Sequence, residues 1–255
     1  MDRSLVTFKP ANTVLNEGSI AAQWLANQPG PFRVYSPSYS IPQQTAAQYG
    51  LQLADGVDPL QLESYSAFME KATGVPREGY SVTLPPFANG NPKTANVGDL
   101  PNTGLLGLLN VRYLVAGYDL PVDGLVLRSE FYGTRLYENL RALPRAWVQP
   151  FESLPGEHAI PAKITDLQPN RIRALAVGPG LFVLSEISYP GWRAFVDGSS
   201  VPIDTVAGLL RGVHLEPGSH QIDFVFRPTS LYIGLVLCGT GLALLFISPH
   251  RSWRR

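Results

Sequence analysis

Two carboxylates in the N-terminal half, Asp55 and Asp58, have the residue types and the spacing for general acid–base chemistry or for binding a cation. Each also has a structural explanation. Asp58 followed by Pro59 has the pattern of a helix N-cap and first helical residue, with Gln61 placed to complete a capping box. Asp55 and Gly56 together form a turn dipeptide. The structural interpretation is the commoner one for such residues, and we favour it.

A second candidate site consists of two aromatic residues, Tyr189 and Trp192, which could form a platform on which a sugar ring stacks. Aromatic residues at the start of a strand more often belong to the hydrophobic core. If both rings are buried, the sugar-binding interpretation loses its basis. Asp197 and Gly198 follow shortly afterwards, and this dipeptide predicts a hairpin turn rather than a site.

The sequence lacks the common signatures of enzymes: it contains no G-x-S-x-G, no P-loop and no G-x-G-x-x-G that opens a helix. Its four histidines show no metal-ligand spacing. We interpret His214 and His220 as exposed residues of neighbouring strands that could meet in space. The single cysteine, Cys238, lies in an apolar run, which excludes disulfides and cysteine-based metal sites within one chain. We therefore predict no catalytic residue, no metal site and no cofactor.

Residues 18–146 carry mixed helix and strand signals. After a short helix and a strand, a glutamine-rich stretch up to residue 49 is expected to be a loop. The clearest helix is expected to start at Asp58 and to stop at Gly74, with Phe68 and Met69 on its apolar face. A proline-rich connection and a buried strand at 111–115 follow. This pattern predicts a small mixed α/β subdomain.

Residues 147–229 have a different pattern of short alternating segments separated by turn signals. In the last of them Ile222, Phe224 and Phe226 share one face. The sequence 216–218, Glu-Pro-Gly, predicts a turn before this strand. Strands this short predict an antiparallel β-sandwich.

Residues 231–248 form a continuous run without any charge, LYIGLVLCGTGLALLFIS. About 18 residues at about 1.5 Å each reach roughly 27 Å, close to the ~30 Å hydrocarbon core of a bilayer. Tyr232 and Trp253 are placed as interfacial anchors, and three arginines follow the run. We predict a transmembrane helix at 230–249, with the basic tail 250–255 in the cytoplasm and residues 1–229 outside. The alternative is a buried core helix.

Composition excludes nucleic acid as a partner, because 20 basic and 20 acidic residues leave no net charge on the 255-residue chain. The first residues, segment 1–17, contain no apolar core of a secretory signal. Two explanations remain: a tail-anchored protein with its bulk in the cytoplasm, or the C-terminal piece of a longer polytopic protein. The arginine-rich tail favours the second.

Several motifs resemble those of the bacterial YfhO family of large polytopic membrane proteins. The segments that carry the resemblance are YPGWRAFVDGSSVPI and LLRGVHLEPGSHQIDFVFRP with the apolar helix after them, and ADGVDPLQLESYSAF, LLNVRYLV and RLYENLRALPRAW upstream. They occur in the family's order and cover residues 30–248. The resemblance implies similarity to GT-C glycosyltransferases, which take sugars from polyprenyl-phosphate carriers, and a role in moving sugars onto cell-envelope polymers or lipids.

The resemblance also implies structural roles for the residues that match these motifs. They are Asp55, Gly56, Asp58, Pro59, Asn110, Tyr113, Pro190, Gly191, Trp192, Asp197, Gly198, Arg211, Gly212 and Pro228. It implies no catalytic residue, because the acidic residues expected to carry catalysis in such enzymes lie in an N-terminal multi-helix portion that this sequence does not match.

These observations predict an α+β protein: a segment at 1–17, a mixed α/β subdomain at 18–146, a β-sandwich at 147–229 and one transmembrane helix. It would be the extracytoplasmic, accessory C-terminal region of a YfhO-like glycosyltransferase in the bacterial cytoplasmic membrane. Expected partners are the lipid bilayer, transmembrane helices of the same or an adjacent protein, and an envelope glycan or lipid-linked sugar. The alternatives are a membrane-anchored carbohydrate-binding module and a purely structural one.

Overall fold

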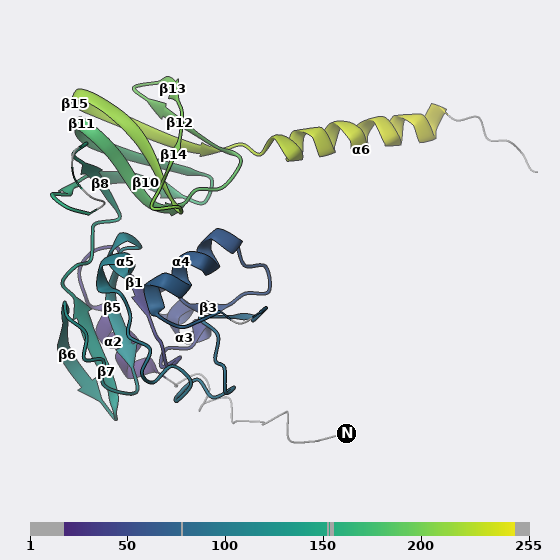
Figure 1. Ribbon diagram of the computed structural model, residues 1–255. Coiled ribbons are helices and arrows are strands. Elements are labelled where there is room, and N and C mark those ends of the chain that lie inside the picture. The colour runs from purple at the N-terminus through teal and green to yellow at the C-terminus, as the bar shows by residue number, and fades with distance from the viewer. Residues whose placement is uncertain (1–17, 78, 152, 154–155, 248–255) are drawn as a thin grey trace, which may run out of the picture.

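The computed structural model describes residues 18–247 except 78, 152, 154 and 155. The predicted segment 1–17 and the basic tail 250–255 with Trp253 lie outside the described residues. A five-stranded mixed sheet carries the N-terminal helices, a larger antiparallel sheet follows, and a C-terminal helix extends away from both (Figure 1). The predicted α+β class is confirmed.

The N-terminal sheet has helices on both faces. Its strands, in spatial order, are β2 (Gln52–Leu53), β1 (Arg33–Tyr35), β5 (Val111–Ala116), β7 (Thr134–Asn139) and β6 (Leu125–Phe131). β1 is parallel to β2 and β5, whereas β5, β7 and β6 are antiparallel. In β5, Tyr113 and Val115 face one core and Leu114 and Ala116 face another, because successive side chains of a strand point to opposite faces.

Two helices cover each face. α2 (Ser19–Ala26) and α3 (Gln43–Gln48) pack in the core with Tyr113, whereas α4 (Glu63–Thr73) and α5 (Thr103–Leu108) pack in the core with Leu114. The expected glutamine-rich loop is therefore wrong in part, because α3 forms within it. Buried Thr45 and Ala46 supply the side of α3 that faces the protein.

The start of α4 corrects the interpretation of Asp58 as a helix cap. Gly56 and Val57 form strand β3, which pairs with β4 (Thr83–Leu84), and the Asp58 N–H donates to Val82 O. This pairing keeps residues 56–58 extended, so the helix begins only at Glu63. The Asp58 carboxylate instead accepts a hydrogen bond from the Leu60 N–H at 2.8 Å. The expected stop at Gly74 is confirmed by its left-handed φ of 74°.

The larger sheet is built on two long strands, β11 (Arg171–Ile187) and β15 (Leu210–Phe226), which pair with each other along their length. The spatial order is β13-β12-β15-β11-β8-β9, with β10 also on β11 and β14 also on β15. The remaining bounds are β8 (Ala146–Gln149), β9 (Ile160–Pro161), β10 (Lys163–Gln168), β12 (Trp192–Val196), β13 (Ser199–Val201) and β14 (Asp204–Val206).

The prediction of a sandwich made of short strands is therefore corrected to one sheet that folds over itself. Residues 216–218, expected to form a turn, lie inside β15, where Gly218 faces Gly178 at a register shift. Phe182 and Phe224 lie about ten positions apart along the strand pair, which is about 33 Å in a flat sheet. Their ring centroids are 6.2 Å apart, so the sheet must bend sharply between them.

Two local predictions in this region are confirmed. Asp197 and Gly198 have φ of 51° and 83° and join β12 to β13 in a two-residue hairpin. Ile222 and Phe224 are buried, as the alternation of that segment indicated.

The two sheets share one hydrophobic core. Trp147 and Val183 of the larger sheet are fully buried in the same cluster as Leu114 and Met69 of the N-terminal part. The predicted boundary between 146 and 147 stays a prediction.

The C-terminal helix, α6 (Thr229–Ile247), corrects the prediction of a transmembrane segment at 230–249. Among the residues that the structure describes, no helix is both long enough and apolar enough to cross a membrane.

Close packing of α5 leads to a first testable prediction. A Cβ on Gly107 would lie 2.1 Å from Arg141 O, whereas a Cβ on Gly104 in the same helix would have Asn102 Oδ1 as its nearest neighbour, at 3.4 Å. Gly107→Ala should therefore lower the free energy of unfolding by about 1–3 kcal/mol through overpacking. Gly104→Ala should change it by less than about 1 kcal/mol. Urea unfolding measures both, and equal effects would contradict the prediction.

Candidate functional site

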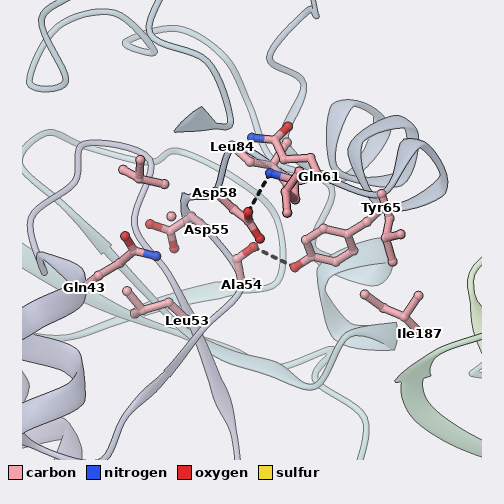
Figure 2. A pocket seen from close by; sticks show the side chains of 13 residues that line it. Gln43, Leu53, Ala54, Asp55, Asp58, Gln61, Tyr65, Leu84 and Ile187 are labelled. Carbon is pink, nitrogen blue, oxygen red and sulfur yellow. Dashed lines mark hydrogen bonds between the residues drawn. The ribbon is translucent and has the colours of Figure 1, made fainter. Parts of the chain in front are cut away.

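A pocket of about 360 Å³ lies where the N-terminal part meets the larger sheet (Figure 2). Asp55 and Asp58 both line it, so the two candidate carboxylates are not on opposite sides of the fold. Gln43, Gln61 and Tyr65 add polar groups, and Ile187 of β11 contributes an apolar wall. We call this the aspartate pocket.

The two carboxylates of the aspartate pocket have different surroundings. Asp55 is buried, and its Oδ1 accepts a hydrogen bond from the Ser36 N–H at 2.9 Å. Burial raises the pKa of Asp55 to about 7, although the hydrogen bond from Ser36 opposes the rise. Asp58 is exposed. One carboxyl group therefore changes protonation near neutral pH.

Among the other polar groups of the aspartate pocket, Tyr65 makes a hydrogen bond within the fold. The Tyr65 hydroxyl donates to Ala54 O at 2.7 Å, and burial raises the pKa of Tyr65 to about 12, so it stays protonated at neutral pH. Among the described residues, no cluster of three or more histidine, cysteine or acidic side chains could hold a metal ion.

A second hollow, of about 320 Å³, lies on the larger sheet near the start of α6. It is lined by Pro169, Asn170, Glu186, Ile187, Tyr189, Trp192, Arg211 and Phe226. We call it the aromatic groove. The Tyr189 ring is 49% exposed and Trp192 is half-buried, so the two rings are not both buried. Phe226 lies between them, with ring centroids 6.5 Å from Tyr189 and 5.3 Å from Trp192.

Arg211 forms the floor of the aromatic groove. Arg211 is only 3% exposed, and its guanidinium carbon lies 3.8 Å from the centroid of the Trp192 ring. Its Nε donates to Ile187 O at 3.1 Å, whereas its Nη1 is buried without a hydrogen-bond partner among the described residues. Burial lowers the pKa of Arg211 to about 10, so the side chain remains charged at neutral pH.

Two more arginines lie behind the groove around Glu186. Arg145 Nε donates to Glu186 Oε1 at 2.9 Å, and Arg33 Nη2 lies 3.3 Å from Glu186 Oε2. Arg33 also donates to Leu109 O and to Ser185, which connects the N-terminal sheet to β11. Burial, followed by repulsion from Arg145, lowers the pKa of Arg33. We call Arg33, Arg145, Arg211 and Glu186 the arginine cluster.

Comparison with known proteins bears on the aromatic groove. Residues 181–238 match the family model described as bacterial membrane protein YfhO. We call this matched stretch, residues 181–238, the YfhO-family region. No curated protein and no solved structure matches the chain.

The YfhO-family region is narrower than the expected resemblance over residues 30–248, but it contains most of the aromatic groove. Glu186, Tyr189, Trp192, Arg211 and Phe226 all lie inside it. Of the aspartate pocket it contains only Ile187.

Several other motif residues of the YfhO-family region have structural positions beside the groove. The Arg227 N–H donates to Gly191 O at 2.6 Å, and a Cβ on Gly191 would lie 3.1 Å from Pro228 Cα. Pro190 is exposed next to Gly191. Gly212 pairs with Val183 in the middle of the sheet. These contacts hold the loop 188–191 against the end of β15.

Motif residues outside the YfhO-family region make contacts within the fold. Asn110 has a left-handed φ of 59°, and its side-chain amide donates to Leu143 O at 2.8 Å. Tyr113 packs in the core against Trp24. Gly56 lies against the Gln43 side chain. Pro59 O accepts a hydrogen bond from Tyr80 at 3.0 Å.

The two strand histidines do not meet. His214 Nε2 lies 3.0 Å from Asp204 Oδ2, and His220 Nδ1 lies 2.6 Å from Asp197 Oδ2. Asp197 is therefore more than a turn residue: it also accepts a hydrogen bond from the Gln221 N–H. The bonds to Asp197 and to Glu216 O raise the pKa of His220.

Sequence reasoning missed three members of the arginine cluster. Arg33 and Ser185 are separated by 152 positions in the chain, so no local pattern links them. The available signal was weak: Arg33 and Arg145 each precede apolar residues of buried strands.

Proposed function

We propose that this chain is the extracytoplasmic C-terminal region of a YfhO-like membrane protein and an accessory part of a polyprenyl-phosphate-sugar-dependent glycosyltransferase. In this proposal it contacts cell-envelope glycan and does no catalysis of its own. The observation that carries the proposal is the aromatic groove, which lies inside the YfhO-family region and near the start of α6.

The lining of the groove suits a saccharide. A sugar ring has apolar C–H faces that stack on aromatic rings and hydroxyl groups that need hydrogen-bond partners. Tyr189, Trp192 and Phe226 supply adjacent rings, while Asn170 and Glu186 supply polar groups at the same hollow.

The position of the groove suits work at a membrane. Only Arg227 and Pro228 separate β15 from α6. The apolar side chains of α6 are exposed: Leu231, Tyr232, Ile233, Leu235, Val236, Leu237, Leu242 and Leu244. We infer that this surface contacts the lipid bilayer or transmembrane helices of the same or an adjacent protein, since exposed apolar patches of this kind mark interaction sites. The groove would then face substrates held at the extracytoplasmic surface.

A glycan-binding measurement tests the proposal. The full chain in detergent should bind members of an immobilised panel of neutral bacterial envelope oligosaccharides. Tyr189→Ala should weaken this binding about tenfold, because an exposed stacking ring is lost. Tyr132→Ala is the matched control, since Tyr132 is 96% exposed in the turn between β6 and β7. No binding to any member of the panel would overturn the proposal in favour of a purely structural module, and so would equal losses in both variants.

A further inference from the structure

The arginine cluster carries more positive charge than its protein partners neutralise. Among the described residues of the cluster, three guanidinium groups share one carboxylate, which leaves two positive charges in excess. Glu186 lies within ion-pair distance of Arg33 and Arg145, whereas in this part of the chain no carboxylate lies within ion-pair distance of Arg211. The side chains of Arg33 and Arg145 are 14% and 7% exposed, so water screens this excess only weakly.

Arg211 is the member of the cluster whose donors are incompletely used. Within the described part of the chain its Nη1 has no hydrogen-bond partner, and a buried unpartnered donor of a charged group is costly. Arg33 and Arg145, by contrast, have several hydrogen bonds each to carboxylate, amide or carbonyl oxygens. Arg211 is therefore the arginine of the cluster that an anion would pair with, and it lines the aromatic groove.

We propose that the aromatic groove binds a phosphomonoester group, with Arg211 as its main ligand and the arginine cluster as the source of its attraction. This proposal rests on the proposed function, because the groove's rings would hold the sugar or other group that carries the phosphate. A phosphomonoester has about −1.5 to −2 charges at neutral pH, which matches the excess of the cluster. A carboxylate would neutralise only half of it. The planar fork of a guanidinium also fits phosphate oxygens in a bidentate manner.

The test is the affinity of the full chain for glucose 1-phosphate and for inorganic phosphate, measured by titration calorimetry at constant ionic strength. We expect the wild type to bind both, and Arg211→Gln to bind at least tenfold more weakly. Arg171→Gln is the matched control: it removes the same charge from the same sheet, at a residue that is already paired with Asp223. Its affinity should equal that of the wild type.

A second variant keeps the test decisive if Arg211→Gln does not fold, because Arg211 also stacks on Trp192. Arg211→Lys keeps the charge but loses the fork, so it should bind with intermediate affinity. Absence of phosphate binding by the wild type, or equal affinities for the wild type and both Arg211 variants, would overturn the proposal.

Two further measurements distinguish a lipid phosphate from a soluble sugar phosphate, and distinguish failure of this inference from failure of the proposed function. Sedimentation with vesicles of phosphatidic acid, compared with vesicles of phosphatidylcholine, shows whether a lipid phosphate is bound. Binding of glucose 1-phosphate without vesicle binding assigns a soluble sugar phosphate. Binding of the neutral oligosaccharides without any phosphate binding would overturn this inference and leave the proposed function standing. Phosphate binding without oligosaccharide binding would overturn the proposed function and leave this inference standing.

Discussion

Replacement of Glu186 with glutamine should lower the free energy of unfolding by about 3–5 kcal/mol, since removal of one partner from a buried ion pair leaves uncompensated charge. Glu186 is the carboxylate between Arg33 and Arg145, and its side chain is 19% exposed. Without it, three arginines would repel one another where the two sheets meet. Guanidinium chloride unfolding at neutral pH measures the change.

Glu138→Gln is the matched control for this prediction. Glu138 also pairs with two arginines, and its side chain is 17% exposed, almost the same fraction as that of Glu186. Its partners, Arg112 and Arg128, are 35% and 43% exposed, so water can solvate them when the carboxylate is lost. We expect a loss of no more than about 1 kcal/mol. Equal losses for the two variants would contradict the account of the arginine cluster as a buried, under-neutralised site.

The stability of the protein should fall between about pH 4 and pH 7 because of Asp55. Burial raises the pKa of Asp55 from its ordinary value of 3.8 to about 7. In this range the folded protein therefore holds a proton that the unfolded chain releases. The protonated form is the stabilised one, so the free energy of unfolding decreases as pH rises, by up to about 1.4 kcal/mol per pH unit.

Asp55→Asn isolates this contribution, because asparagine keeps an oxygen that can accept the Ser36 N–H and does not titrate. The variant should match the wild type near pH 4 and exceed it by about 4 kcal/mol at pH 8. The measurement is urea unfolding of both proteins across this range. Asp58→Asn serves as the control, since it removes an exposed carboxylate from the same pocket. A flat difference for Asp55→Asn would contradict the prediction.

Local sequence was sufficient wherever a few neighbouring residues decide the backbone. Gly74 ends α4 because a left-handed residue is needed there. Asp197 and Gly198 turn a hairpin for the same reason. The apolar residues at 111–115 and the alternation at 222 and 224 correctly predicted which side chains are buried, since burial follows the period of the strand. The motifs near Trp192 also resembled the family that the comparison later matched.

Tertiary pairing overrode local signals at Asp58 and at residues 216–218. Asp58 has every feature of a helix cap, but the pairing of β3 with β4 holds that segment extended. The Glu-Pro-Gly sequence favours a turn in isolation, yet Gly218 meets Gly178 inside a strand pair of 17 residues on each side. In both cases the partner that decides the conformation comes from a distant segment, so a local pattern cannot contain it.

By itself the sequence determined the α+β class, the main turns, the buried faces of several strands and the similarity of its C-terminal region to the YfhO family. Only the tertiary structure brought Arg33 and Arg145 to Glu186 and placed Arg211 against the Trp192 ring. The physical reason is that charge compensation depends on the distances between charged groups in the folded protein, and not on their separation along the chain. Each arginine is ordinary in its own segment, and the excess charge exists only where the two sheets meet.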